Sequence, residues 1–169
     1  MNSDATPELT PEKLAEIERE FDPETAFRPT GKTLGFVIAA ILVSMSVYHF
    51  YASGFGLVRE LVHRGIHLSF VLGLVFLLFG VRKNDTLPPK AWYRFDGVPL
   101  IDIVFAVLAV GAAMYLPLLP AAALAQRVGN PSPSDIFMGS ALLLLTLEAT
   151  RRSVGPTLPI IGLMFIGFA

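Results

Sequence analysis

The sequence predicts an all-α integral membrane protein with four transmembrane helices, the start of a fifth, and a cytosolic N-terminal tail that contains a short amphipathic helix. Of the 169 residues, 53% are hydrophobic and only 16% are charged, against about 25% in an average soluble domain. The charges gather in short blocks that separate long apolar runs. The net charge of −1 argues against nucleic acid as a partner, and the lack of cysteine excludes disulfides and thiolate chemistry.

Residues 1–32 are expected to form the cytosolic leader. The segment opens on acidic and polar residues, which is not the pattern of a secretory signal peptide. Thr10 is a candidate N-cap, and Pro11 fits the first helical position. An apolar stripe at helical spacing follows: Leu14, Ile17 and Phe21. The stripe allows either a helix that docks on the cytosolic face or a loosely ordered leader.

Residues 33–153 are expected to form a four-helix membrane domain. The four apolar runs are Thr33–Tyr51, Ile66–Val81, Val98–Leu119 and Ile136–Thr150, the last with Ser134 or Asp135 as its cap. At 1.5 Å per residue, the first run covers roughly the 30 Å of a bilayer core. The stretch "GLVRELVHRG" before the second run is amphipathic and is expected at the interface. Residues 156–169, "PTLPIIGLMFIGFA", are interpreted as the start of a further apolar helix.

Lysine and arginine set the expected orientation. One side carries Arg28, Lys32, Arg82, Lys83, Lys90, Arg94, Arg151 and Arg152, and the other carries Arg59, Arg64 and Arg127. The excess predicts a cytosolic N-terminus. Trp92 and Tyr93 are expected to anchor the chain at the inner interface, and Tyr51 belongs to an aromatic cluster at the outer one.

The charges after "LLLLTL" raise the question of whether they lie inside the membrane. A single helix through to Ala169 would place three charges near the bilayer centre, at about 2.5–3.5 kcal/mol each. A span that ends near Thr150 avoids that cost. Glu148 and Arg152 then form an i, i+4 pair next to Arg151. We therefore expect these charges to mark the cytosolic edge.

Asp102 is the strongest single candidate for a functional residue, because an ionisable group inside a membrane span is a functional hypothesis by default. It lies about one turn inside the third run, and Arg151 or Arg152 should lie at the same depth. A structural ion pair is the favoured interpretation, and ion coupling is the alternative. The candidates for structure and assembly are Asp102, Glu148, Arg151 and Arg152.

No catalytic or metal site is expected. Glu60, His63 and His67 could share one helical face, and two histidines at i, i+4 can bind zinc. The sequence offers no evident third ligand, so an interfacial polar face is favoured. His49 is expected to stand alone near the outer end of the first span, in a packing or interfacial role.

Four stretches carry a family resemblance: "EREFDPETAFRPTG", "YASGFGLVRELVHRGIHLSFVLGLVFLLF", "GNPSPSDIFMGSALLLL" and "LLLLTLEATRRSVGPTLPIIGLMFIGFA". Together they resemble the small membrane domain, with its junction, of the fused permease of tripartite ATP-independent periplasmic (TRAP) transporters. The branch that matches best is the one served by TAXI-type binding proteins. The resemblance covers about residues 18–169.

This resemblance implies a scaffold role in the cytoplasmic (inner) membrane of a bacterium or archaeon. In that family the small four-helix domain supports a large transport domain, which holds the substrate and sodium sites and is fed by a periplasmic binding protein. The implied partners are therefore that large domain, a TAXI-type binding protein and the lipid bilayer. No substrate-binding residue, cofactor or enzymatic activity is expected in this segment. A sodium gradient would drive only the complete transporter.

Two other classes remain open. A membrane-embedded enzyme would need a convergent polar site within the bilayer, and the spans supply only Asp102 and Glu148. A small autonomous carrier or channel would use Asp102 as its intramembrane carboxylate, although such carboxylates lie deeper in their spans.

Overall fold

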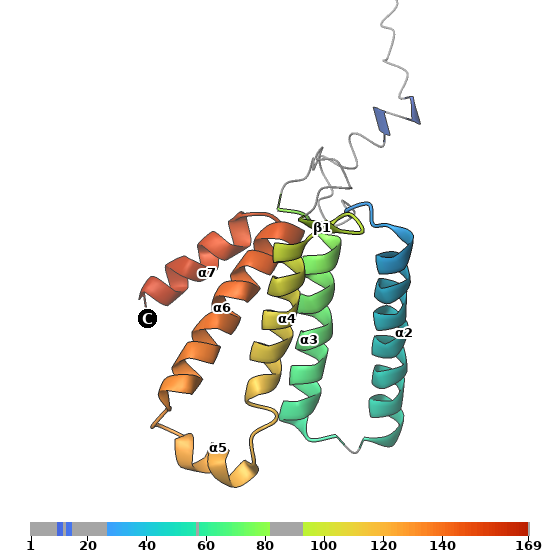
Figure 1. Ribbon diagram of the computed structural model, residues 1–169. Coiled ribbons are helices and arrows are strands. Elements are labelled where there is room, and N and C mark those ends of the chain that lie inside the picture. The colour runs from blue at the N-terminus through green and yellow to red at the C-terminus, as the bar shows by residue number, and fades with distance from the viewer. Residues whose placement is uncertain (1–9, 12, 15–26, 57, 82–92, 169) are drawn as a thin grey trace, which may run out of the picture.

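The computed structural model describes residues 10–11, 13–14, 27–56, 58–81 and 93–168. This part of the chain is mostly helical (Figure 1). Its elements are α2 (Lys32–Phe55), α3 (Glu60–Leu78), β1 (Arg94–Phe95), β2 (Val98–Pro99), α4 (Leu100–Tyr115), α5 (Ala121–Arg127), α6 (Pro133–Ser153) and α7 (Thr157–Phe168).

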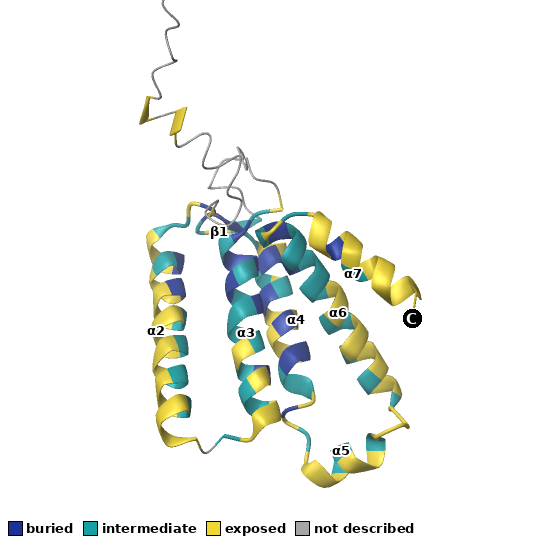
Figure 2. Cartoon of the chain, turned by 180° about the vertical axis from the view of Figure 1, so that it is seen from behind, coloured by how far each residue is buried: buried dark blue, intermediate teal, exposed yellow. Residues whose placement is uncertain are grey.

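The helices α2, α3, α4 and α6 stand side by side and alternate in direction, with α2 at one edge of the array (Figures 1 and 2). Among the helix pairs, α3 and α4 form the most extensive contact, and α7 packs against α6. The β1–β2 hairpin lies at one end of the array, called here the hairpin end, and α5 lies at the other, called the α5 end.

Small residues allow α4 to pack closely in this array. Four alanines of α4 are buried: Ala106, Ala109, Ala112 and Ala113. A glycine on α3 serves the same purpose, because a Cβ at Gly65 would lie 2.4 Å from the Pro117 side chain. Small residues at such contacts let two helix backbones approach each other.

The outer surface of the array is strongly apolar, and much of α2 and α7 is exposed (Figure 2). Phe36 and Phe50 on α2 are 77% and 81% exposed, and Phe165 on α7 is 70% exposed. By length and composition, α2 and α3 could each cross a membrane, while α4 and α7 are shorter apolar helices. The described residues thus support a mostly helical chain with two candidate spans of the four that the sequence predicts.

The starts of α3 and α6 differ most from the sequence prediction. The second helix begins at Glu60 rather than at Ile66, so most of the expected interfacial stretch forms the first turns of α3. The N-cap of α6 is Ser132, not Ser134 or Asp135. The Ser132 hydroxyl accepts from the Asp135 N–H at 3.3 Å, and the Asp135 carboxylate accepts from the Ser132 N–H at 2.7 Å. This reciprocal capping box satisfies two backbone donors at once.

The hairpin was not predicted, yet it holds the start of α2. Asp96 and Gly97 form its turn with φ angles of 51° and 94°, as a two-residue Asp-Gly loop requires. The Asp96 carboxylate accepts from the Leu34 N–H at 2.7 Å, and the Asp96 carbonyl accepts from the Gly31 N–H at 2.9 Å. A residue from the hairpin therefore caps α2, whose own N-cap is a glycine.

Several sequence predictions fall outside the described residues, among them Trp92 and most of the leader. The leader helix does begin as predicted, because the Thr10 hydroxyl accepts from the Lys13 N–H at 3.4 Å. Tyr51 is partly exposed and stacks on Phe55 with ring centroids 5.1 Å apart. The Tyr93 carbonyl accepts from the Leu100 N–H at 2.8 Å, next to the start of α4.

Candidate functional site

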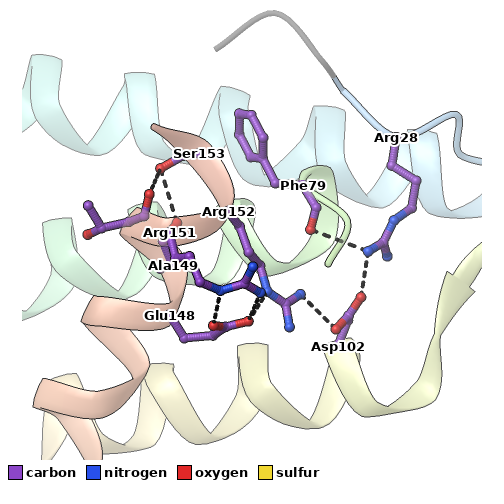
Figure 3. A network of polar contacts seen from close by, with 9 residues as sticks. Arg28, Phe79, Asp102, Glu148, Ala149, Arg151, Arg152 and Ser153 are labelled. Atoms are coloured by element: carbon purple, nitrogen blue, oxygen red, sulfur yellow. Dashed lines mark hydrogen bonds and ion pairs between the residues drawn. The ribbon is translucent and has the colours of Figure 1, made fainter. Parts of the chain in front are cut away.

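Five charged side chains meet at the hairpin end (Figure 3). They come from the leader, the first turn of α4 and the last two turns of α6: Arg28, Asp102, Glu148, Arg151 and Arg152. Four of them are the candidates that the sequence predicted, and the fifth, Arg28, had been counted only as a charge that sets orientation.

Asp102 is the centre of this ion cluster and is fully buried. One carboxylate oxygen accepts from Arg28 Nη2 at 2.5 Å, and the other accepts from Arg152 Nη1 at 2.7 Å. The carboxylate also lies in the first turn of α4, where the backbone N–H groups favour negative charge. Each oxygen of Asp102 therefore has its own guanidinium partner.

Arg152 links the two carboxylates of the cluster. Its Nη1 reaches Asp102, and its Nε donates to Glu148 Oε1 at 2.7 Å. The guanidinium carbon lies 5.0 Å from the ring centroid of Phe76 and 5.7 Å from that of Phe105. Only 1% of this side chain is exposed, so aromatic faces take the place of water around the cation.

Arg151 pairs with Glu148 instead of Asp102. Its Nε and Nη2 donate to the two oxygens of Glu148 at 2.7 and 2.8 Å, a bidentate geometry. The Arg151 side chain is 39% exposed. Of the two arginines that the sequence offered as partners for Asp102, the structure selects Arg152.

Arg28 ties the leader to the end of α3. Its N–H donates to the Leu78 carbonyl at 2.7 Å, and its Nη2 also donates to the Phe79 carbonyl at 3.3 Å. The last turn of α3 contains no basic residue, so an arginine from elsewhere satisfies carbonyls that the helix leaves open. Its Nε and Nη1 are buried and have no hydrogen-bond partner within the described part of the chain.

The geometry suits this cluster to holding segments together. It connects the leader, the end of α3, the start of α4 and the end of α6. Guanidinium groups keep their protons in proteins, so Asp102 faces two permanently charged partners, Arg28 and Arg152. Releasing Asp102 to carry an ion would strand two buried cations, which is costly.

The polar residues at the α5 end form pairs. Glu60 pairs with Arg64, both being exposed, and the Tyr48 hydroxyl lies 3.0 Å from His63 Nδ1. His49 Nε2 lies 2.9 Å from His67 Nδ1. The expectation that His49 stands alone is therefore wrong, because the antiparallel packing of α2 and α3 brings it opposite His67. No group of three or more metal-ligating side chains occurs in the described residues.

Comparison with protein-family models, with curated proteins and with solved structures found no match. The resemblance to the TRAP permease domain therefore stands on the sequence motifs alone.

Proposed function

We propose that this chain is the scaffold domain of a TRAP-type secondary transporter for solute uptake. The observation that carries the proposal is that arginine side chains pair with both carboxylates of the ion cluster at the hairpin end. Both oxygens of Asp102 and both oxygens of Glu148 accept from arginine. Such carboxylates stabilise a structure but are poorly placed to bind and release a coupling ion.

The proposed location is the cytoplasmic membrane of a bacterium or archaeon, with four spans formed by α2, α3, α4 and α6. The exposed phenylalanines of α2 and α7 support it, since contiguous apolar surface of this kind is unfavourable in water. The hairpin end carries more positive charge than the α5 end, which supports a cytosolic hairpin end.

The proposed partner of α6 and α7 is a large transport domain. The α7 helix has one buried residue, Pro159, and an otherwise apolar and largely exposed surface. By the family resemblance, the transport domain would use a sodium gradient and would receive substrate from a TAXI-type binding protein.

Affinity purification of the tagged chain from its native membranes in a mild detergent tests this proposal. We expect a larger polytopic membrane protein to co-purify. Phe165→Ala on α7 should reduce the amount of partner recovered, whereas Phe36→Ala, at a similarly exposed phenylalanine on α2, should not. A chain that is recovered without any membrane partner, or that loses its partner equally with both substitutions, contradicts the proposal.

A further inference from the structure

The α5 end holds α2 against α3 through imidazole rings. His49 on α2 and His67 on α3 share a hydrogen bond between Nε2 and Nδ1 at 2.9 Å, with ring centroids 5.0 Å apart. Beside them, the Tyr48 hydroxyl lies 3.0 Å from Nδ1 of His63. Within the described residues, these are the side-chain hydrogen bonds between α2 and α3.

The second half of α2, which lies at the α5 end, contains no buried residue. The buried residues of α2 are Leu34 and Ile38, which both lie in the first two turns at the hairpin end. From position 39 to position 55, every residue of α2 is exposed or half-buried. This half is therefore attached through two partly buried side chains that pack against the core, Ile41 and Met45, together with the His49–His67 and Tyr48–His63 contacts.

The proton positions in the pair follow from its neighbours. His49 Nδ1 lies 2.7 Å from the Met45 carbonyl, which only accepts, so Nδ1 of His49 carries a proton. In the neutral ring Nε2 is then the acceptor, and Nδ1 of His67 donates to it. One added proton is tolerated, because His49 Nε2 can donate while His67 moves its own proton to Nε2.

A second added proton, which would leave both rings charged, cannot be accommodated in this hydrogen-bond geometry. With both rings charged, the two facing nitrogens each carry a hydrogen, and neither can accept. The hydrogen bond is lost, and two cations face each other across the interface. The Tyr48–His63 contact differs, because a hydroxyl can donate to a neutral ring or accept from a charged one.

The surroundings do not neutralise that second charge. Glu60 is already paired with Arg64, and Arg59 donates to the Pro117 carbonyl at 3.3 Å. The other titratable groups described at this end are His63 and Tyr48 beside the pair, Tyr51, which stacks on Phe55, and Tyr115, Arg127 and Asp135, which bond to one another. A cavity of about 260 Å³ is lined in part by Glu60 and His63, and His67 is itself exposed.

We propose that the His49–His67 pair is a proton-binding latch. It holds the second half of α2 against α3 while the pair is neutral or has bound one added proton, and it releases that half when a second added proton binds. Imidazole is the side chain that changes charge between about pH 5 and pH 8, so the latch responds to acidification of the aqueous phase at the α5 end.

Distances between pairs of spin labels in the full chain, reconstituted in lipid nanodiscs, test the latch. The sequence contains no cysteine, so Phe50→Cys on α2 and Leu118→Cys after α4 report the α5 end alone. Between about pH 7.5 and about pH 5, we expect this distance to lengthen by about 5 Å, half a helix diameter. A control pair, Phe36→Cys with Val104→Cys, should keep its distance.

Two amide variants complete the experiment. In His67→Asn an amide replaces Nδ1, and in His49→Gln an amide replaces Nε2. Each variant keeps one imidazole of the pair, and the amide can donate to its neutral form or accept from its charged form, so the hydrogen bond remains at both pH values. Each should keep the α5-end distance short at both pH values. The proposal is overturned if the wild-type distance does not change, if it changes equally in both variants, or if the control pair moves with it.

Discussion

Arg152 Nη1 donates to Asp102 Oδ1 at 2.7 Å, which joins the last turn of α6 to the first turn of α4 across 50 residues of sequence. The two helices run in opposite directions, so the carboxylate lies at a helix N-terminus and the guanidinium at a helix C-terminus. Each charge therefore complements the dipole of its own helix as well as its partner. This pair is the closest link between the two helices at the hairpin end for which the structure gives a distance.

The first prediction concerns this pair. Asp102→Ala should lower the free energy of unfolding by about 3–5 kcal/mol, because it strands the buried Arg28 and Arg152. Combining it with Arg152→Ala should be less than additive by about 0.5–3 kcal/mol. Combining it with Arg151→Ala should be nearly additive. Denaturant unfolding in detergent micelles measures all the variants.

Glu60→Ala is the matched control, since it removes a carboxylate from a pair whose side chains are 77% and 73% exposed. Its effect should stay within about 0.5 kcal/mol. A coupling energy larger for Arg151 than for Arg152 would contradict the arrangement of the cluster.

The second prediction tests the cap that the hairpin provides for α2. A Cβ at Gly31 would lie 1.6 Å from an Asp96 carboxylate oxygen, so Gly31→Ala must displace this cap. A lost N-cap costs about 0.5–2 kcal/mol. Adding Asp96→Gly should then cost little more, because the displaced carboxylate no longer caps the helix. Thermal unfolding of the single and double variants measures the effect.

Gly139→Ala on α6 is the control for that series. No described atom lies within 4 Å of the position its Cβ would take, and alanine favours a helix interior over glycine by about 1 kcal/mol. It should therefore be neutral or stabilising. Equal losses for Gly31→Ala and Gly139→Ala would show that the close approach at Asp96 does not matter.

The third prediction is a pH dependence at the start of α6. Hydrogen bonding by Ser132, with further contributions from Tyr115 and Arg127, lowers the pKa of Asp135 from 3.8 to about 2, although partial desolvation opposes this. A carboxylate with a lowered folded-state pKa contributes stability above its unfolded pKa and loses it as the pH falls through the folded value. Its contribution should therefore be full above about pH 4 and should disappear towards about pH 2.

Asp135→Asn isolates that contribution. The difference in thermal unfolding midpoint between wild type and Asp135→Asn should be largest above about pH 4 and should shrink towards about pH 2. A difference that stays constant over this range would mean that the carboxylate is not held in its charged form by these partners.

The fourth prediction is topology. The chain has no cysteine, so single cysteines can be labelled without background. Gln126→Cys on α5 should react with a membrane-impermeant thiol reagent in intact cells, and Val154→Cys at the hairpin end should react only after permeabilisation. The opposite pattern would place the hairpin end outside the cytosol.

The sequence predicted the helices better than the contacts between them. Long apolar runs and blocks of charge are local patterns, so α2, α3, α4 and α6 could be located from them. The partner of Asp102 was narrowed to two arginines by shared depth, but distinguishing Arg151 from Arg152 depends on which side chain faces α4. That orientation is a tertiary property.

Three features were missed because they join segments distant in sequence. Arg28 is 74 residues from Asp102, Asp96 is 62 residues from Leu34, and His49 is 18 residues from His67. The sequence did contain some signals of these contacts. The Asp96-Gly97 dipeptide is typical of a hairpin turn, and the lack of a basic residue in the last turn of α3 left carbonyls that needed a donor.

Ion flux into proteoliposomes that contain this chain alone tests the scaffold assignment most directly. Under an imposed sodium or proton gradient, the account predicts no flux above that of protein-free liposomes, for wild type and for Asp102→Asn alike. A gradient-driven flux in the wild type that Asp102→Asn abolishes, with the helical content of the two proteins equal by circular dichroism, would contradict the account and identify an autonomous carrier that uses Asp102.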